Sequence, residues 1–310
     1  MRERLGKVFV KKLLAPVVGG VHAANPDLLE MEALVPGLLA AAKESGSLVG
    51  AVKIFRAKSS RPGSAVMGLR KGIFTLIDAL ERDLRTRGVA IDLGAEVKSV
   101  VRIESGWLVE VHGGGVIKAS SLVLALPAHR AANIMKSEPT LCLPLSRLVT
   151  ADVALVLMVV RSAQLNLAPL GSGILIAPGS LDVLAKASTH ATAKWGELQE
   201  IFGADIHLLR FSYGRDGVLP EDMENLPAQA LRDAEKIYGV QDMELLESKV
   251  VNWPKSLIHA QAGHLASIKE MREALAHFEN LTIVGAGLGG NGITGVIQQT
   301  RESVAGLQVA

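Results

Sequence analysis

Residues 280–300, NLTIVGAGLGGNGITGVIQQT, decide how this chain of 310 residues is interpreted. An apolar run from Leu281 to Val284 stands directly before a literal G-x-G-x-x-G, Gly285 to Gly290, and a helix-like segment follows from about Ile293. A strand, a glycine loop and a helix in this order are typical of a dinucleotide-binding turn. The loop ends only about 20 residues before Ala310, which leaves too few residues for both the helix and the second parallel strand that should follow such a turn.

The position of the loop changes its interpretation. A Rossmann fingerprint needs a second parallel strand, which usually ends in an acidic residue about 20 positions further on. Glu302 lies at a similar distance, but within the expected final helix. We therefore expect the last strand and helix of an α/β domain. The small residues of the glycine loop still let its backbone and the N-terminus of the following helix approach a flat or anionic ligand. The alternative is a glycine turn that only packs the final helix.

Composition narrows the class of protein. Apolar residues make up 49% and charged residues 21%, the balance of a globular chain with a substantial core. The 33 basic and 31 acidic residues nearly cancel, so no nucleic-acid partner is expected. A single cysteine, Cys142, excludes an internal disulfide and a cysteine-based zinc site, and it fits the reducing cytoplasm. The apolar stretch 149–160 is too short to span a membrane and predicts a buried strand.

The order of predicted elements indicates an α/β fold with a mixed middle third. Near the N-terminus, we expect a helix over 2–15 that Pro16 ends, an irregular link at Gly19–Gly20, and a helix capped by Asn25. Further along, periodicity predicts helices over 73–84, 221–239 and 263–278, and strands over 89–104, 106–113, 115–127, 149–160, 172–178, 206–214, 245–254 and 281–284. Such an order suggests a nucleotide-type domain that is interrupted by a substrate-type domain.

Seven short motifs then gather into one pattern. They are LLAPVVGGVHAANP (13–26), Gly46–Leu48, Met67–Leu69, Val97–Val100, Ala125–Pro127, Trp253–His264 and Gly285–Ile297. Their order resembles the C-terminal two-thirds of the oxygen-dependent protoporphyrinogen/coproporphyrinogen oxidases, FAD enzymes of haem synthesis. The resemblance covers nearly the whole chain. It implies an FAD/NAD(P)-binding-type α/β fold with an inserted mixed-sheet substrate domain, and a chain that lacks the N-terminal Rossmann βαβ unit of the family.

The resemblance also implies which residues meet the ligands. On the flavin side it points to Val97, Trp253, Ala286, Asn291, Gly292 and Ile293. On the porphyrinogen side it points to Val21, His22 and Ala24. The implied chemistry is hydride loss from a porphyrinogen bridge carbon to FAD, repeated three times, with O2 regenerating the flavin. No catalytic side chain and no metal ligand is identified.

The resemblance further implies four segments. Residues 1–58 form a helical segment at the pocket or the membrane side, 59–134 and 258–310 are parts of the FAD domain, and 135–257 form the substrate domain. Several positions depart from the family pattern: Ala24 replaces a glycine, Ile258-His259-Ala260 replaces Pro-Gln-Tyr, and Asn291 breaks the closing motif. Because the pyrophosphate-binding unit is not in this sequence, we expect the chain alone to bind FAD weakly or not at all.

Alternatives stay open at this point. The chain could be a truncated or split oxidase, a porphyrin-binding partner of a separately encoded FAD-binding half, or another flavin amine oxidase or desaturase. The substrate could be protoporphyrinogen IX or coproporphyrinogen III. A homodimer and peripheral contact with the inner membrane are further alternatives, the latter because the first 40 residues are rich in Leu and Val. His22, His259 and His264 could handle protons or only pack, and Trp253 could face the flavin or fill the core.

Overall fold

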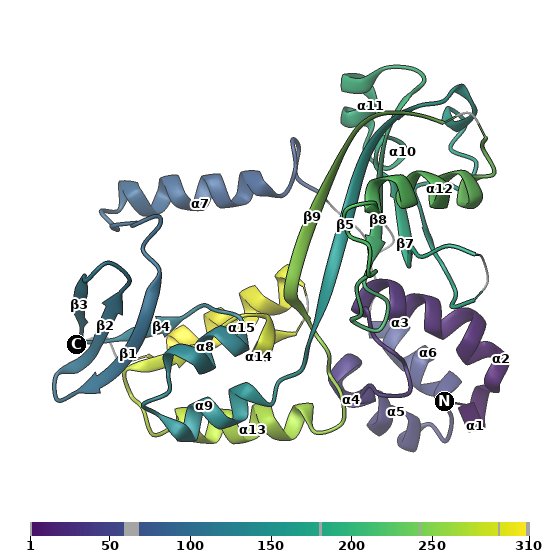
Figure 1. Cartoon of the computed structure of the whole chain (residues 1–310). Coiled ribbons are helices and arrows are strands. Elements are labelled where there is room, and N and C mark those ends of the chain that lie inside the picture. Colours follow the sequence, from purple (N-terminus) through teal and green to yellow (C-terminus); the bar gives the residue numbers. More distant parts are fainter. Residues whose placement is uncertain (1, 59–67, 180–181, 242, 291, 308–310) are drawn as a thin grey trace.

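A small helical module begins the chain in the computed structural model, which describes residues 2–58, 68–179, 182–241, 243–290 and 292–307 (Figure 1). Its elements are α1 (Arg2–Leu5), α2 (Lys7–Phe9), the π-helix η1 (Val10–Leu14), α3 (Ala15–His22), α4 (Met31–Leu34), α5 (Leu38–Glu44) and α6 (Leu48–Lys58). Among the described residues, no helix has the length and apolar character needed to cross a membrane.

Three predictions for this module are wrong. Pro16 does not end the first helix, because it lies in the first turn of α3, where its missing N–H is not needed. Gly19 and Gly20 continue α3, and a Cβ atom at Gly20 would lie 2.6 Å from Leu175 Cδ2, so a glycine allows the close approach. Asn25 does not cap a helix. Its Oδ1 instead accepts a hydrogen bond from the Asp27 N–H at 3.0 Å, which forms a local turn.

An isolated helix and a small antiparallel sheet follow. The predicted helix is α7 (Phe74–Thr86), which stands away from the rest of the chain and has no buried residue (Figure 1). The predicted hairpin is confirmed as β1 (Val97–Ile103), β2 (Gly106–Val111) and β3 (Val116–Ala119), in which Arg102 lies opposite Trp107. The first strand starts at Val97 rather than at the expected Val89.

The segment 280–300 forms a parallel strand pair with a distant part of the chain. Strand β10 (Leu281–Ile283) pairs with β4 (Leu122–Leu124), so that Leu281 lies opposite Leu122. Around this pair lie α8 (Ala128–Ile134), α9 (Pro139–Ser146), α13 (His264–Leu275), α14 (Ala286–Gly289) and α15 (Ile293–Ala305). Their buried side chains, among them Met135, Leu141 and Met271, make one hydrophobic core with Trp107. Helices α8 and α9 were not predicted.

A five-stranded sheet is inserted between β4 and β10. Its strands are β5 (Thr150–Arg161), β6 (Gly173–Leu175), β7 (Ala187–His190), β8 (Ile206–Tyr213) and β9 (Glu244–Ile258), in the order β6-β7-β8-β5-β9. The remaining elements are η2 (Ala163–Leu165), α10 (Ala191–Lys194), α11 (Gly196–Phe202) and α12 (Leu226–Tyr238). Alternate side chains of β5, such as Val156 and Met158, are buried in the core shared with α12, whereas Leu155 and Leu157 are half-buried on the other face. The predicted α/β fold with an inserted sheet is confirmed, but the sheet itself is not mixed, because all four of its strand pairs are antiparallel.

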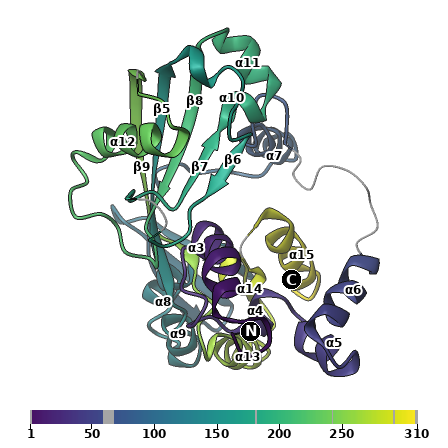
Figure 2. The same ribbon diagram turned by 90° about the vertical axis from the view of Figure 1, so that its right-hand side faces the viewer.

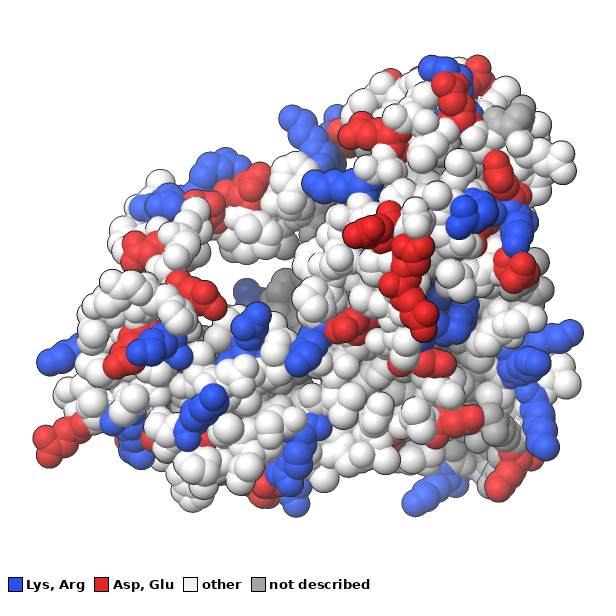
Figure 3. Space-filling model, viewed as in Figure 1, with Lys and Arg blue, Asp and Glu red and all other residues white. Residues whose placement is uncertain are grey.

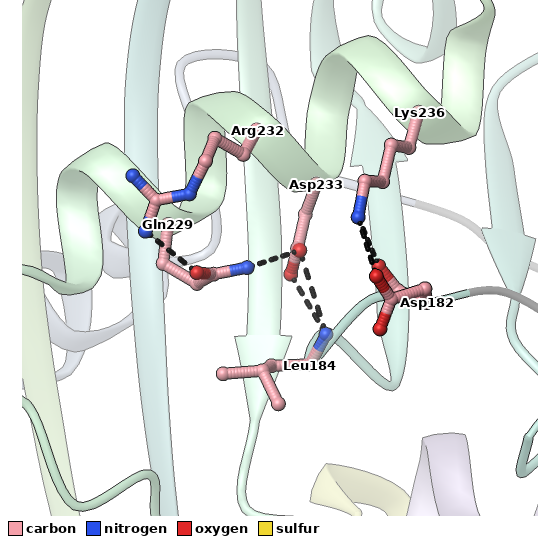
Figure 4. A network of polar contacts seen from close by, with 6 residues as sticks. All are labelled: Asp182, Leu184, Gln229, Arg232, Asp233 and Lys236. Carbon is pink, nitrogen blue, oxygen red and sulfur yellow. Dashed lines mark hydrogen bonds and ion pairs between the residues drawn. The ribbon is translucent and has the colours of Figure 1, made fainter.

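A buried carboxylate fixes α12 to this sheet (Figure 4). Asp233 is fully buried and accepts hydrogen bonds from the backbone N–H of Ala185 at 2.8 Å and of Leu184 at 3.2 Å. The Tyr213 hydroxyl donates to it at 3.1 Å and the Gln229 amide at 2.7 Å. Burial and the adjacent carboxylate raise the pKa of Tyr213 well above its ordinary value. The oxygens of Asp233 are therefore occupied by neutral donors, none of them a cation.

Candidate functional site

The glycine loop does two different things on its two sides. Gly289 and Gly295 bring the backbones of α14 and α15 into contact, because a Cβ atom at Gly289 would lie 2.8 Å from the Gly295 carbonyl oxygen. A Cβ atom at Gly295 would lie 2.5 Å from the Gly289 oxygen. Gly290 and Gly292, by contrast, have positive φ angles of 80° and 116° and nothing within 4 Å of a Cβ position. The loop therefore packs α15 and also leaves open space beside its backbone.

The N-terminus of α15 faces solvent without a side-chain cap. Gly292 is the N-cap residue, and the first bond back to it comes from the Val296 N–H at 3.2 Å. Among the described residues, no side chain caps this first helical turn, so its N–H groups can face a ligand, and the helix dipole favours an anionic one. Gln299 holds the loop in place, since its Oε1 accepts from the Gly285 N–H at 3.1 Å and its Nε2 donates to the Ile283 oxygen at 3.3 Å.

The residues predicted on the flavin side gather partly here. Trp253 lies on β9 opposite Val153 and is 51% exposed, so it does not fill the core. Ala286 begins α14, which contacts β9 (Figure 1), and Ile293 begins α15 with half of its surface exposed. Val97 is half-buried and packs against the core that contains Ile283 and Leu288. Asn291 lies outside the described residues.

The residues predicted on the substrate side gather at the end of α3. Val21 is 53% exposed, His22 is half-buried, and Ala24 is buried on the wall of a cavity of about 400 Å³. Between them, Ala23 takes a left-handed backbone conformation, and its carbonyl accepts a hydrogen bond from His259 Nε2 at 2.7 Å. Ala23 also packs against Val153, the strand partner of Trp253. The two predicted groups are thus joined through the β5–β9 strand pair rather than mixed in one cluster (Figure 2).

Burial lowers the pKa of two histidines in this region, His22 and His264. Burial lowers the pKa of His22, and the nearby His259 and Lys186 lower it further. Burial also lowers the pKa of His264, which begins α13 as predicted and lines a second cavity of about 350 Å³ with Arg147 and Glu270, themselves an ion pair. The Nδ1 atoms of His22 and His264 are buried and find no hydrogen-bond partner within the part of the chain that the structure describes. A neutral imidazole with a free ring nitrogen can accept a hydrogen bond or donate one, depending on its tautomer.

Two cationic residues were missed by sequence reasoning. Arg215 lines the same cavity as Ala24, and Lys186 lies fully buried next to it. The signal for Arg215 was the segment Gly-Arg-Asp-Gly, which directly follows a predicted strand and forms a tight turn with positive φ at Gly214 and Gly217. No local pattern marks Lys186, because its burial depends on α3 and on the turn at Arg215, both remote in sequence.

The geometry at α15 suits part of a flavin cofactor. Open backbone at Gly290 and Gly292 and uncapped N–H groups at Ile293 could approach an isoalloxazine ring or a phosphate, and the exposed ring of Trp253 lies on the neighbouring strand. Among the described residues, β4 and β10 are the two strands that pair in parallel. A single parallel pair is less than the sheet of a complete dinucleotide-binding domain.

Comparison with known proteins agrees with this geometry. The family described as flavin containing amine oxidoreductase matches residues 1–299. Proteins named coproporphyrinogen III oxidase are 29% identical over 296 residues in Mycobacterium tuberculosis (strain CDC 1551 / Oshkosh), 30% over 316 residues in Mycobacterium leprae (strain TN) and 26% over 317 residues in Bacillus subtilis (strain 168). These alignments cover 94%, 99% and 98% of this chain, but only 61%, 65% and 65% of the relatives.

Solved structures extend the comparison. One named as a protoporphyrinogen oxidase, from Exiguobacterium sp. 255-15, superposes with a TM-score of 0.80 at 25% identity, over 97% of this chain and 64% of its own. Reduced UDP-galactopyranose mutase superposes with a TM-score of 0.68 at 10% identity, over 93% of this chain and 62% of its own, which shows the fold alone. The resemblance inferred from the seven motifs is confirmed, and the chain belongs to the flavin containing amine oxidoreductases, whose expected cofactor is FAD.

Proposed function

We propose that this chain carries the flavin-facing and substrate-facing parts of a porphyrinogen oxidase, which oxidises protoporphyrinogen IX or coproporphyrinogen III to the porphyrin with O2 as acceptor. The uncapped start of α15 beside open glycine backbone is the observation that carries the proposal. Supporting it, relatives named coproporphyrinogen III oxidase align over nearly the whole chain. We place this activity in the cytoplasm.

The flavin-side residues would bind and orient the cofactor. Bound FAD would accept the hydride from the bridge carbon of the porphyrinogen. The free N–H groups at Gly292 and Ile293 would hold an electron-rich edge of the ring, and Ala286 is small enough to let backbone lie close to it. Trp253 would shield one side from water, since half of its surface is otherwise exposed. Val97 would contribute on the adenine side.

The substrate-side residues would position the macrocycle. Val21 offers an exposed apolar surface for it, and Ala24 forms the cavity wall behind. Burial, with His259 and Lys186 nearby, lowers the pKa of His22, so its neutral ring would be able to accept a hydrogen bond from a pyrrole N–H. A neutral acceptor at this place would steady the pyrrole that loses a proton when its neighbouring bridge loses a hydride.

A second candidate is a partner chain that needs a separate segment to complete the FAD site. The apolar residues Phe74, Ile77, Leu80 and Leu84 of α7 are 60%, 61%, 50% and 40% exposed, although they share one helical face. Parallel strands such as β4 and β10 are normally covered and extended by further strands. Figure 3 shows a hollow between α7 and the body of the molecule. The chain spans less than two-thirds of the relatives' length.

Other assemblies are weaker candidates. Exposed side chains such as Val8, Leu13 and Val49 in the first 58 residues would supply a surface for peripheral membrane contact. The same exposure would serve a homodimer. Another flavin amine oxidase or desaturase activity has only the shared fold in its favour.

The experiment is a reconstitution followed by porphyrin fluorescence. The chain, with and without a fragment of a longer relative that supplies the remaining length, receives FAD and either coproporphyrinogen III or protoporphyrinogen IX in air. We expect flavin binding and porphyrin formation only when the fragment is present, and Trp253→Ala to reduce both more than the control Trp195→Phe. A stoichiometric flavin spectrum from the chain alone would refute the need for a companion. Absence of porphyrin formation and of porphyrin binding in every mixture would refute the proposed activity.

A further inference from the structure

Lys186 is a buried cation without a counter-charge. It is 1% exposed, and no hydrogen bond or ion pair of its ammonium group is found among the described residues. The buried carboxylate of α12, Asp233, accepts hydrogen bonds from neutral donors, as described above. Burial and the adjacent Arg215 lower the pKa of Lys186 to about 8, so the group still carries a proton for most of the time at neutral pH. A protein interior rarely keeps such a charge unless it is used.

Arg215 stands next to this ammonium group and reaches the cavity described above. Its Nη1 and Nη2 both donate to the Ile176 carbonyl at 3.2 Å, and Nη2 also donates to Ala185 at 3.3 Å. Because a guanidinium has five N–H donors, part of its hydrogen-bonding capacity remains for a ligand. Gly19 of α3 lies against it, with a Cβ position 3.6 Å from Nη1. The guanidinium is therefore held rigidly while it lines a cavity of about 400 Å³.

The cavity wall carries more positive than negative charge. Lys7 and Lys11 line it together with Arg215, and the π-helix η1 contributes Lys11. The acidic groups on the wall are Asp27 and Asp216, and Asp216 is the acid that acts on Arg215. Lys186 adds a fourth cation behind the wall, beside Arg215. Among titratable neighbours, His22 lies close enough to Lys186 for that charge to lower the pKa of His22.

We propose that this cavity binds a carboxylate group of a ligand, with Arg215 in direct contact, Lys7 and Lys11 at the wall, and Lys186 supplying positive potential from behind. Planar, bidentate recognition by arginine suits a carboxylate. The identification of the ligand rests on the proposed function: a porphyrinogen carries carboxylate side chains, and one such arm fits this volume. Ala24, predicted on the substrate side, shares the wall with Arg215.

A small carboxylate tests the site without any porphyrin. Thermal unfolding of the chain is measured in sodium propionate and in sodium chloride of equal ionic strength, for the wild type, Lys186→Met, Arg215→Gln and the control Lys98→Gln on the distant hairpin. We expect propionate to raise the unfolding temperature of the wild type and of the control. Lys186→Met is expected to unfold at a higher temperature than the wild type in chloride, yet to lose most of the response to propionate. Lower stability of Lys186→Met in chloride, with an undiminished response, would overturn the proposal.

Porphyrin binding separates this inference from the proposed function. Coproporphyrin III and its tetramethyl ester are titrated against the same variants by fluorescence. The expected result is about tenfold weaker binding of the acid by Lys186→Met, and no difference between variants for the ester. If the acid binds equally well to all variants, the carboxylate site is wrong and the proposed function stands. If neither porphyrin binds while the propionate response still depends on Lys186, the site stands and the proposed substrate is wrong.

Discussion

Gly295→Ala would separate two effects that act in opposite directions on the same helix. Inside an α-helix, alanine is more favourable than glycine by about 1 kcal/mol. In α15, however, the added methyl group would lie 2.5 Å from the Gly289 carbonyl oxygen, closer than non-bonded atoms can approach. The Gly289 oxygen is part of the backbone, so relief requires α14 and α15 to move apart. Overpacking of this kind costs about 1–3 kcal/mol. Because a backbone oxygen cannot rotate aside as a side chain can, we take the upper part of this range, about 2–3 kcal/mol, and subtract the gain of about 1 kcal/mol, which leaves a net loss of roughly 1–2 kcal/mol in the free energy of unfolding.

Urea unfolding followed by far-UV circular dichroism would measure this loss. The matched control is Gly196→Ala in α11, where nothing lies within 4 Å of the Cβ position. The control should be as stable as the wild type or slightly more stable. If Gly295→Ala also proves as stable as the wild type, the contact between α14 and α15 does not need glycine, and the argument that the loop serves packing on one side and a ligand on the other is refuted.

Three further perturbations follow from the same structure. Asp233→Ala should lower the free energy of unfolding by about 3–5 kcal/mol, because it leaves the buried donors around that carboxylate without an acceptor. The control is Asp182→Ala, which removes the exposed ion-pair partner of Lys236 and should change the free energy of unfolding little. Equal effects of the two substitutions would contradict this reasoning. Burial and His207 lower the pKa of His190 from 6.5 to about 4, so the unfolded chain binds the proton more readily and stability should fall as pH drops from 6.5 towards 4. Thermal scans of His190→Gln should show a weaker dependence over that range, and an unchanged dependence would reject His190 as its source. Ile77→Ser in α7 should leave the unfolding temperature of the chain unchanged, since that side chain is 61% exposed; a clear decrease would mean that α7 packs against the chain in solution.

The local hydrophobic pattern of the sequence was sufficient to predict an element where the pattern follows directly from burial. The apolar stretch 149–160 predicted a buried strand, which is β5, and the position of the glycine loop at the chain end placed β10 and α15 correctly. Local rules failed where packing overrides them. Pro16 and Gly19 look like helix-ending residues, yet α3 tolerates the proline in its first turn and uses the glycine for contact with Arg215. The sequences of helices α8 and α9 show no clear apolar stripe, because several of the side chains that they bury are alanines, which do not stand out in a hydrophobic pattern.

The candidate site was predictable only in part for a related reason. Motifs indicated Trp253, Ala286 and Ile293, and the structure places them on neighbouring elements, but whether they touch a flavin stays a prediction. Lys186 and Arg215 were out of reach, because the significance of a cation depends on which carboxylates surround it. That information resides in the contacts between α3, β7 and the turn at Gly214, which lie far apart in the sequence.

The pairing of Thr150 with Ile258 has a consequence for how the chain finds its fold. The segment between them enters and leaves the sheet at adjacent points, so once it is folded it acts as a short bridge. Strands β4 and β10 lie at 122–124 and 281–283. When the folded sheet replaces residues 150–258, the flexible chain between these two strands is about a third as long as the full segment, which lowers the entropic cost of pairing them by about 1 kcal/mol. The insertion should therefore form first and bring the two distant strands together, and residues 148–260 are a natural unit to express alone.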